Sequence, residues 1–248
     1  MSTAAERREE LKAVWRQAQS CTKCPQLAST RNTVVFGSGN ADADLMFVGE
    51  APGRSEDEQG LPFVGQAGRL LDTLLGEIGL QRTDVFICNT LKCRPPGNRD
   101  PLPQEIDACQ DYLFRQLELI RPRVVCTLGN FSTKLLRADP TGITRLHGRE
   151  EVRRIGPRNV RLYPIYHPAA ALYTPKMLDT LREDFGRLPA LLALDPPPQP
   201  EPEREPELVA PEPEVVAPES SASLRSSPAA ASPSPRVEEP EPAQLGLF

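Results

Sequence analysis

The segment DLMFVGEAPGRSEDEQGLPFVGQAG, from Asp44 to Gly68, joins an apolar run of strand length to a turn rich in glycine and proline. The apolar run ends at Val48, and the turn that follows extends from Gly49 to Gly53. Glycines at the carboxyl end of a strand allow a ligand to approach the backbone closely. Because ligands of open α/β sheets bind beyond the carboxyl ends of the strands, we expect the functional site at this turn.

Apolar runs of strand length alternate with apolar residues at helical spacing along most of the chain. The pattern predicts helices over 3–19, 70–78, 106–117, 130–137 and 175–193, and strands over 44–48, 84–88, 123–128 and 161–166. This alternation predicts a three-layer α/β/α fold with a central four-stranded parallel sheet. Right-handed crossovers then place every strand end on one rim, which brings four residues to a single crevice: Glu50, Asn89, Gly129 and His167.

The composition changes near residue 196. From there onward the chain holds 14 of its 28 prolines and ten Glu against three Arg, a net charge of −7. Since the whole chain carries −5, residues 1–195 are mildly basic, at about +2. A segment rich in Pro, Glu and Ala buries too little apolar surface to offset its ordering entropy. We therefore predict one folded domain over 1–195 and a disordered linker over 196–243.

The sequence does not predict a membrane segment. No apolar run reaches the ~18 residues of a membrane-spanning helix, and charged residues interrupt the N-terminal region. We therefore expect a cytoplasmic protein that does not contact a membrane, and we expect it to be a monomer.

The chain contains six cysteines. In a reducing compartment they indicate a metal site or buried thiols rather than disulfides. Cys88 and Cys126 fall within apolar strand runs and are expected to be small buried residues. The other four form a C-x2-C pair and a more distant pair, a pattern that suits thiolate ligation of either zinc or an iron–sulfur cluster. They are Cys21, Cys24, Cys93 and Cys109.

Three motifs occur together with this cysteine pattern: GEAPGRSEDEQGLPFVGQAG (49–68), NTLKCRPPGNRDP (89–101) and HPAA (167–170). In this order the chain resembles the family 4 uracil-DNA glycosylases, the iron–sulfur-containing branch of that superfamily. The resemblance covers about residues 5–193. It implies a uracil-DNA glycosylase domain over 1–195 in which the four cysteines hold a [4Fe–4S] cluster.

The resemblance also implies a reaction. The protein is expected to flip uracil out of DNA and hydrolyse its N-glycosidic bond, leaving an abasic site for base-excision repair. Phe63 should stack on the uracil ring, and Asn89 should hydrogen-bond its Watson–Crick edge. His167 should lie at the uracil O2, where negative charge develops as the bond breaks. The backbone of the turn should contact the ring as well, through Gly49, Glu50 and Ala51.

A carboxylate beside the attacking water or the sugar would stabilise the other half of the transition state. In the best-known branch of the superfamily an Asp occupies the position of Ala51 and orients the water. This chain lacks that carboxylate, and Glu50 and Glu56 are the expected substitutes.

Basic residues near the cysteine-bearing loop and before the last strand are expected to contact DNA phosphates. They are Arg94, Arg99, Arg145 and His147. A related branch links itself covalently to the abasic sugar through a histidine in this region, so self-linkage through His147 is one alternative. A non-catalytic DNA-binding module is a second alternative, and a redox sensor is a third.

The last five residues read QLGLF (244–248). They resemble the short peptide with which bacterial repair proteins bind the sliding clamp, with Gln244, Leu245, Leu247 and Phe248 as the anchors. At the end of a disordered linker this peptide would keep the enzyme near the replication machinery, in association with the nucleoid.

Overall fold

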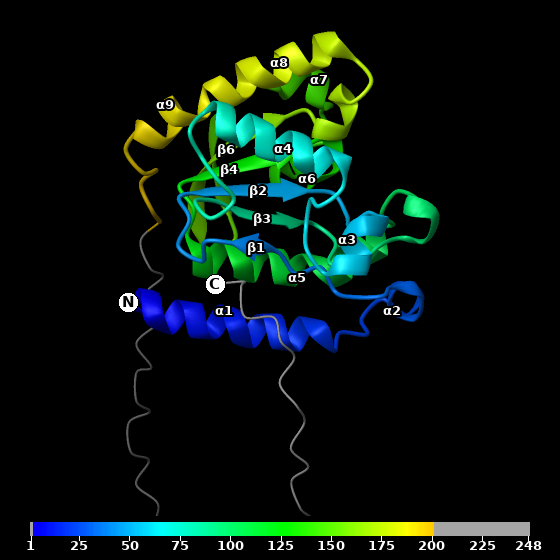
Figure 1. Cartoon of the computed structure of the whole chain (residues 1–248). Helices are drawn as coiled ribbons and strands as arrows, with labels where there is room; N and C mark the ends of the chain where they lie inside the picture. Colours follow the sequence, from blue (N-terminus) through cyan, green and yellow to red (C-terminus); the bar gives the residue numbers. More distant parts are fainter. Residues whose placement is uncertain (1, 201–248) are drawn as a thin grey trace, which may run out of the picture. The chain divides into compact units, whose positions relative to one another are not determined.

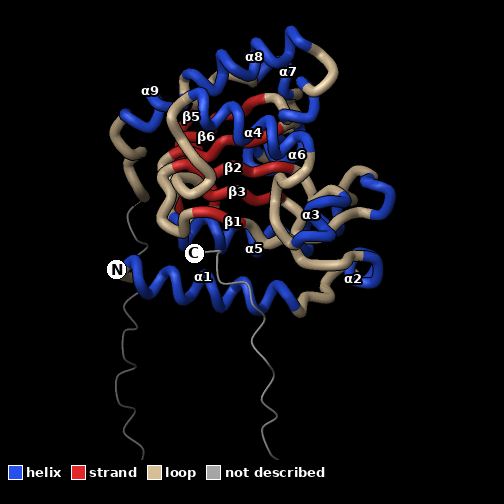
Figure 2. Tube along the Cα trace, in the orientation of Figure 1, coloured by secondary structure: helices blue, strands red, loops and turns tan. Residues whose placement is uncertain are grey.

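The computed structural model describes residues 2–200 of the 248-residue chain. Most of the predicted linker and the whole QLGLF peptide (244–248) lie outside these residues. Figure 1 shows the described part as a central sheet with helices on both sides, and Figure 2 shows the same arrangement as a tube.

The sheet has six strands in the order β1-β3-β2-β4-β6-β5. The strands are β1 (Ser38–Gly39), β2 (Leu45–Gly49), β3 (Phe86–Asn89), β4 (Val124–Leu128), β5 (Glu151–Ile155) and β6 (Arg158–Ile165). The four central strands, β3, β2, β4 and β6, run parallel, whereas β1 and β5 pair antiparallel at the two edges. The carboxyl ends of the four parallel strands therefore meet at one edge of the sheet.

The helices connect these strands and cover both faces. They are α1 (Ala4–Gln19), α2 (Pro25–Thr30), α3 (Arg54–Gln59), α4 (Gln66–Glu77), α5 (Pro103–Ile120), α6 (Asn130–Arg137), α7 (Ile143–Leu146), α8 (Pro175–Gly186) and α9 (Leu188–Ala193). Two short 3-10 turns, η1 (Pro96–Asn98) and η2 (Pro168–Ala171), lie near the strand ends.

Alternate residues of the central strands face opposite helical layers, as the pleat of a strand requires. Met46 and Val48 of β2 pack into the core beneath α1, α5 and α6. Leu45 and Phe47 pack into the core beneath α4, α8 and α9. In Figures 1 and 2 these layers lie on opposite sides of the strands, with α1 and α5 below and α4 and α8 above. Burial on both faces explains why the strands read as continuous apolar runs.

The predicted layering and the four predicted parallel strands are confirmed. The edge strands β1 and β5 are additional, and their sequences explain why no pattern indicated them. β1 comprises only Ser38 and Gly39, and β5 reads EVRRI, in which charged side chains occupy most positions. The predicted helix over 175–193 is divided at Arg187, because Pro189 in the first turn of α9 cannot continue the hydrogen bonding of α8.

None of the helices in residues 2–200 combines the length and the apolar character needed to cross a membrane.

Candidate active site

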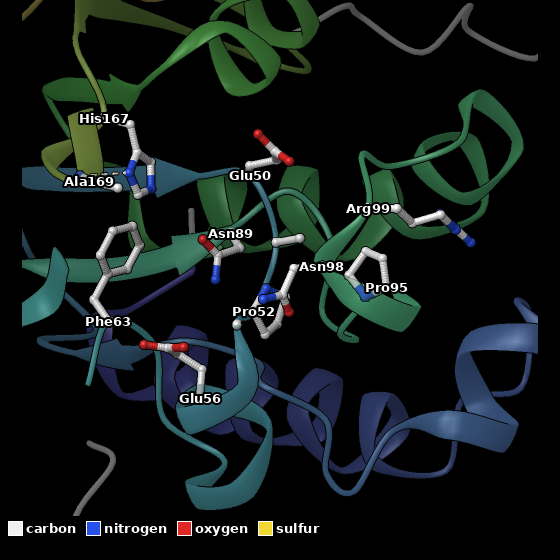
Figure 3. A pocket seen from close by; sticks show the side chains of 12 residues that line it. Glu50, Pro52, Glu56, Phe63, Asn89, Pro95, Asn98, Arg99, His167 and Ala169 are labelled. Atoms are coloured by element: carbon white, nitrogen blue, oxygen red, sulfur yellow. Dashed lines mark hydrogen bonds between the residues drawn. The ribbon is translucent and has the colours of Figure 1, made fainter. Parts of the chain in front are cut away.

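A cavity of about 350 Å3 opens beyond the carboxyl ends of β2, β3 and β6. Its walls come from the turn after β2, the α3–α4 region, the end of β3, the loop around η1 and the turn after β6. The lining residues are Glu50, Ala51, Pro52, Gly53, Glu56, Phe63, Asn89, Pro95, Asn98, Arg99, His167 and Ala169. Figure 3 shows Phe63, His167 and Asn89 gathered on one side of the cavity and Arg99 on the other. The structure thus brings together Glu50, Asn89 and His167, as the sequence predicted, whereas Gly129 does not line the cavity and lies against His167.

Phe63 adopts a backbone conformation that phenylalanine rarely adopts, with φ at +53°. Two side chains fix the loop around it. The Glu56 carboxylate accepts hydrogen bonds from the backbone N–H groups of Val64 and Gly65, each at 2.9 Å. The Arg82 guanidinium donates to the carbonyl oxygens of Pro62 (3.0 Å) and Phe63. The loop is therefore fixed through both its donors and its acceptors.

The Phe63 ring lies against the His167 ring, with centroids 5.5 Å apart and planes inclined by 27°. Gly49, the last residue of β2, makes this arrangement fit. A side chain there would collide with the Asn89 amide oxygen and come within 2.7 Å of the Phe63 ring. Glycine at position 49 therefore allows the Asn89 and Phe63 side chains to lie close to the backbone of β2.

Asn89 is the last residue of β3, and its side chain is almost fully buried. The neighbouring Thr90 N–H donates to the Gly49 carbonyl, and the Leu91 N–H donates to the Glu50 carbonyl. These bonds continue the pairing of β2 and β3 past the strand ends. The Asn89 amide is consequently held at the floor of the cavity by rigid backbone on both sides.

His167 follows β6 and is held as a hydrogen-bond donor. Its Nδ1 accepts the Ala169 backbone N–H at 3.1 Å, so the proton of the neutral ring is on Nε2. Burial lowers the pKa of His167 to about 4, an effect that the negative charge of Glu56 partly opposes. At neutral pH the ring therefore offers a neutral N–H.

The two candidate carboxylates have different surroundings. Burial raises the pKa of Glu50, and the nearby charge of Asp100 raises it further. Glu56 lines the same cavity, but its Oε1 is engaged by the two backbone N–H groups of the Phe63 loop. Asp57, adjacent to Glu56 in sequence, is buried away from the cavity and accepts hydrogen bonds from Asn32. Glu50 and Glu56 therefore differ in their hydrogen-bonding partners. The sequence alone did not predict this difference.

A second, smaller cavity is lined by all four cysteines that the sequence singled out: Cys21, Cys24, Cys93 and Cys109. None of them forms a disulfide. Two of the sulfurs accept hydrogen bonds. The Arg31 guanidinium donates to Cys93 Sγ at 3.2 Å, and the Lys92 backbone N–H donates to Cys109 Sγ at 3.3 Å. Within residues 2–200 no three His, Cys, Asp or Glu side chains are arranged to hold a single metal ion. Four thiols around a common cavity, with cationic side chains beside them, fit an anionic group wider than one ion. Cys88 and Cys126 are fully buried in β3 and β4, as expected.

The basic residues expected to contact DNA divide into two groups. Arg99 lines the main cavity, but its guanidinium forms a two-point ion pair with Glu105, at 2.6 and 2.9 Å. Arg94 donates to the Asn98 amide oxygen at 2.7 Å.

Arg145 and His147 lie elsewhere, along a separate hollow that Arg149 and Arg187 also line. There His147 Nδ1 lies 3.1 Å from the buried carboxylate of Asp184. Its ring also contacts Tyr166, the residue before His167, at a centroid distance of 4.6 Å.

Several residues of the site were not predicted. Pro95, Asn98 and Ala169 line the cavity, and Arg82 fixes the Phe63 loop from a position 19 residues away. Pro95, Asn98 and Ala169 lie within the quoted motifs, and the Gly97-Asn98 pair is typical of a turn with positive φ, which both residues adopt. Long-range partners such as Arg82 leave no local pattern.

Comparisons with known proteins agree with this geometry. A family profile described as "Uracil DNA glycosylase superfamily" matches residues 36–187. The Type-4 uracil-DNA glycosylase of Archaeoglobus fulgidus is 49% identical over 185 residues, which cover 73% of this chain and 92% of that protein. The Type-4 uracil-DNA glycosylase of Sulfurisphaera tokodaii is 44% identical over 185 residues, which cover 73% of this chain and 84% of that protein. A Type-5 uracil-DNA glycosylase of Pyrobaculum aerophilum is more distant, at 29% identity over 60% of this chain and 78% of that protein.

The contact between Gly68 and the Phe63 loop gives a matched pair of glycine substitutions in α4. A Cβ at position 68 would collide with the Phe63 carbonyl, whereas a Cβ at position 76 meets nothing within 4 Å. We expect Gly68→Ala to lower the free energy of unfolding by about 1–3 kcal/mol, through overpacking against the backbone. Gly76→Ala should raise it by about 0.4–1 kcal/mol, because alanine restricts the unfolded chain. Urea denaturation of both variants measures this difference, and equal midpoints would contradict the assigned contact.

Proposed function

Because the chain belongs to the uracil DNA glycosylase superfamily, and within it to the Type-4 uracil-DNA glycosylases, we propose that the cavity beyond β2, β3 and β6 holds uracil flipped out of DNA. The protein is a hydrolase of N-glycosyl bonds that removes uracil from DNA in base-excision repair. The observation that carries the assignment of the site is the convergence of Phe63, Asn89 and His167 on one cavity.

Recognition of the base is assigned to Phe63 and Asn89. A flat aromatic face suits stacking on a pyrimidine, and the fixed loop keeps the Phe63 ring in place before DNA arrives. The Asn89 amide offers both a donor and an acceptor to the Watson–Crick edge of uracil. Cytosine presents the reversed pattern at that edge, so the same amide would reject it. The backbone of Gly49, Glu50 and Ala51 completes the contact with the ring.

Bond cleavage is assigned to His167 on the side of the leaving group. As the N-glycosidic bond breaks, uracil gains negative charge and the sugar gains oxocarbenium character. A neutral Nε2–H directed at the uracil O2 stabilises this anion without a proton transfer. The hydrogen bond from Ala169 to Nδ1 supports the role, because it selects the tautomer that can donate.

Glu50 is the carboxylate that we assign to the attacking water and the sugar. It lines the cavity, and its raised pKa makes it a stronger base than an exposed glutamate. Glu56 contributes through the Phe63 loop and through its charge on His167. Glu56 is therefore a positioning residue in this assignment.

The function is tested with a uracil-containing oligonucleotide, followed by alkali cleavage and a denaturing gel. Wild-type protein should break the strand at uracil. Asn89→Ala and His167→Ala should each lower the single-turnover rate by about 10²-fold, because each removes one directed contact to the base. Asn159→Ala, on the exposed β5–β6 hairpin, is the matched control and should retain the wild-type rate. Equal rates for all four proteins would contradict the assigned cavity.

The same gel separates the alternatives. A slow-migrating protein–DNA band in place of strand breakage would establish covalent linkage and favour His147 as the linking residue. Binding to uracil-containing DNA without either signal would leave a non-catalytic binding module.

We further propose that Cys21, Cys24, Cys93 and Cys109 hold a [4Fe–4S] cluster. The shared cavity and the adjacent cations of Arg31 and Lys92 support this assignment, because a thiolate-ligated cluster is anionic. When bound, the cluster crosslinks the segment after α1 to the end of β3 and to α5. The cysteines come from three separate parts of the chain, so this bracing role favours a structural site over a redox sensor.

Cysteine substitutions test the cluster. Cys93→Ala and Cys109→Ala should lose the bound iron and the visible absorption of the purified protein, and their melting temperature should fall. Cys88→Ala and Cys126→Ala should retain the iron, because these thiols lie within the strands and away from the cysteine-lined cavity. Loss of iron in the second pair as readily as in the first would overturn the ligand assignment.

DNA contact is assigned to Arg94 and Arg99 on the loop beside the base cavity, and to Arg145 and His147 along the separate hollow. The hollow lined by Arg145, His147 and Arg149 supports this assignment, because several cationic side chains there face solvent together. Arg99 contributes less charge than its position suggests, since Glu105 already pairs with it.

For the C-terminal QLGLF peptide (244–248) we propose binding to the sliding clamp, through Gln244, Leu245, Leu247 and Phe248. The supporting observation is the spacing of its glutamine and apolar residues, which follow a segment rich in Pro and Glu. We also propose that the protein acts as a monomer and associates with the nucleoid through these contacts.

Deletion of residues 244–248 tests this proposal. The truncated protein should lose co-purification with the clamp yet cleave free oligonucleotides at the wild-type rate, because the deleted residues lie outside the glycosylase domain. A variant with Leu247 and Phe248 both changed to Ala is the matched full-length control and should behave like the deletion. Equal clamp retention by all three proteins would contradict the proposal.

A further inference from the structure

We propose that Lys92 is a positioning residue that couples the cysteine site to Asn89, and that recognition of the base therefore depends on this buried lysine. The inference rests on the proposed roles of Asn89 and of the four cysteines. Its basis is one side chain that contacts the backbone of Asn89 and a glutamine of α5, while its own backbone contacts Cys109.

Lys92 is one of the most deeply buried charged residues in the described part of the chain, with 1% of its surface exposed. Its Nζ donates to the carbonyl oxygen of Asn89 at 2.7 Å and to Gln116 Oε1 at 2.6 Å. The ammonium also lies 5.9 Å from the centre of the Phe36 ring. All three of these partners are neutral.

A buried charge is costly unless an opposite charge compensates it. Neither the Asn89 carbonyl nor the Gln116 amide supplies such a charge. The cysteine site would supply it when its thiols are ligated, because Lys92 lines the cysteine cavity together with Cys93 and Cys109. Negative charge on ligating thiolates would stabilise the ammonium where it lies, and this explains why a lysine rather than a neutral residue occupies the position.

Gln116, which accepts a hydrogen bond from the Lys92 ammonium, is also held in place. Gln116 lies seven residues after Cys109 on α5, so both side chains project from one face of that helix. The Gln116 amide donates to the Phe36 carbonyl at 2.9 Å, which turns its oxygen toward Lys92. Helix α5 therefore holds Lys92 at both its backbone and its ammonium.

These contacts of Lys92 fix the position of Asn89. Its carbonyl is held by Lys92, and its side chain lies against Gly49 and Phe63 at the floor of the cavity. Release of the carbonyl would let the end of β3 move and would displace the Asn89 amide from the base edge. Small displacements of such groups have large effects on recognition.

The test uses two oligonucleotides and the full-length protein. One carries an uncleavable 2′-fluorinated deoxyuridine, and the other carries a tetrahydrofuran abasic analogue at the same position. The ratio of their affinities isolates the contacts to the base from the contacts to the backbone. Lys92→Met keeps the length and apolar stem of the side chain but removes the charge and the hydrogen bonds.

We expect Lys92→Met to weaken binding of the uracil oligonucleotide by about three- to tenfold, the effect of one hydrogen bond, and to leave binding of the abasic analogue unchanged. Gln116→Met should lower the affinity ratio in the same direction, although it touches no cysteine. Lys134→Met is the matched control. Lys134 is an exposed lysine of α6 that lines neither the base cavity nor the cysteine cavity, so its affinity ratio should equal that of the wild type.

A double-mutant comparison tests the coupling directly. In an Asn89→Ala background, Lys92→Met should change the affinity ratio by less than twofold, because the group that it positions is already absent. If Lys92→Met does not fold or loses its iron, Gln116→Met decides alone, since it loosens the same ammonium from the opposite side.

Two results would overturn the inference. One is an unchanged affinity ratio in Gln116→Met and in an iron-loaded Lys92→Met. The other is an equal fall in Lys134→Met. A wild-type protein that neither cleaves at uracil nor prefers it to the abasic analogue would instead refute the proposed function.

Discussion

The site depends on the conformation of Phe63, a residue other than glycine at a positive φ. Such a conformation costs about 1–3 kcal/mol and persists only where the surroundings enforce it. Here Glu56 and Arg82 hold the loop from opposite sides, and Gly68 leaves room for its carbonyl. The strain places an aromatic ring against His167 before any ligand arrives. A cavity that is rigid in the free protein loses less entropy when it binds a base.

Buried carboxylates near this loop hold neighbouring segments in place through hydrogen bonds. Asp57 accepts hydrogen bonds from Asn32 and so fixes the segment that follows α2. Glu105 pairs with Arg99 and also accepts the Leu102 N–H at the start of α5. Asp57 has its partner 25 residues away along the chain, whereas the partners of Glu105 lie within six residues of it. The bonds to Asp57 join the segment after α2 to α3, and Arg99, which also donates to Gln26 of α2, joins that helix to the loop around η1.

The sequence predicted the central fold because burial on both faces makes each parallel strand a clear apolar run. It also placed Glu50, Asn89 and His167 together, since strand ends share one rim whenever the crossovers are right-handed. It did not predict β1 or β5, because short or charged edge strands carry no comparable pattern. The different partners of Glu56 and Asp57 were also hidden. Adjacent residues on a short helix point in different directions, and only the packing of α3 decides which one faces the cavity.

Because position 51 is an alanine, another residue must supply the carboxylate that assists the water and the sugar. With Ala51 in the turn, the nearest acid is Glu50, whose pKa burial raises. A partly desolvated carboxylate gains most when positive charge develops beside it, as it does on the sugar when the bond breaks. On the opposite side His167 remains neutral, because its pKa lies near 4. With a neutral donor at His167, oriented hydrogen bonds rather than ion pairs would stabilise the charge that develops on the leaving base. This explains why the loop, the strand ends and the histidine are all held by backbone contacts, since such dipoles stabilise developing charge only when they cannot reorient.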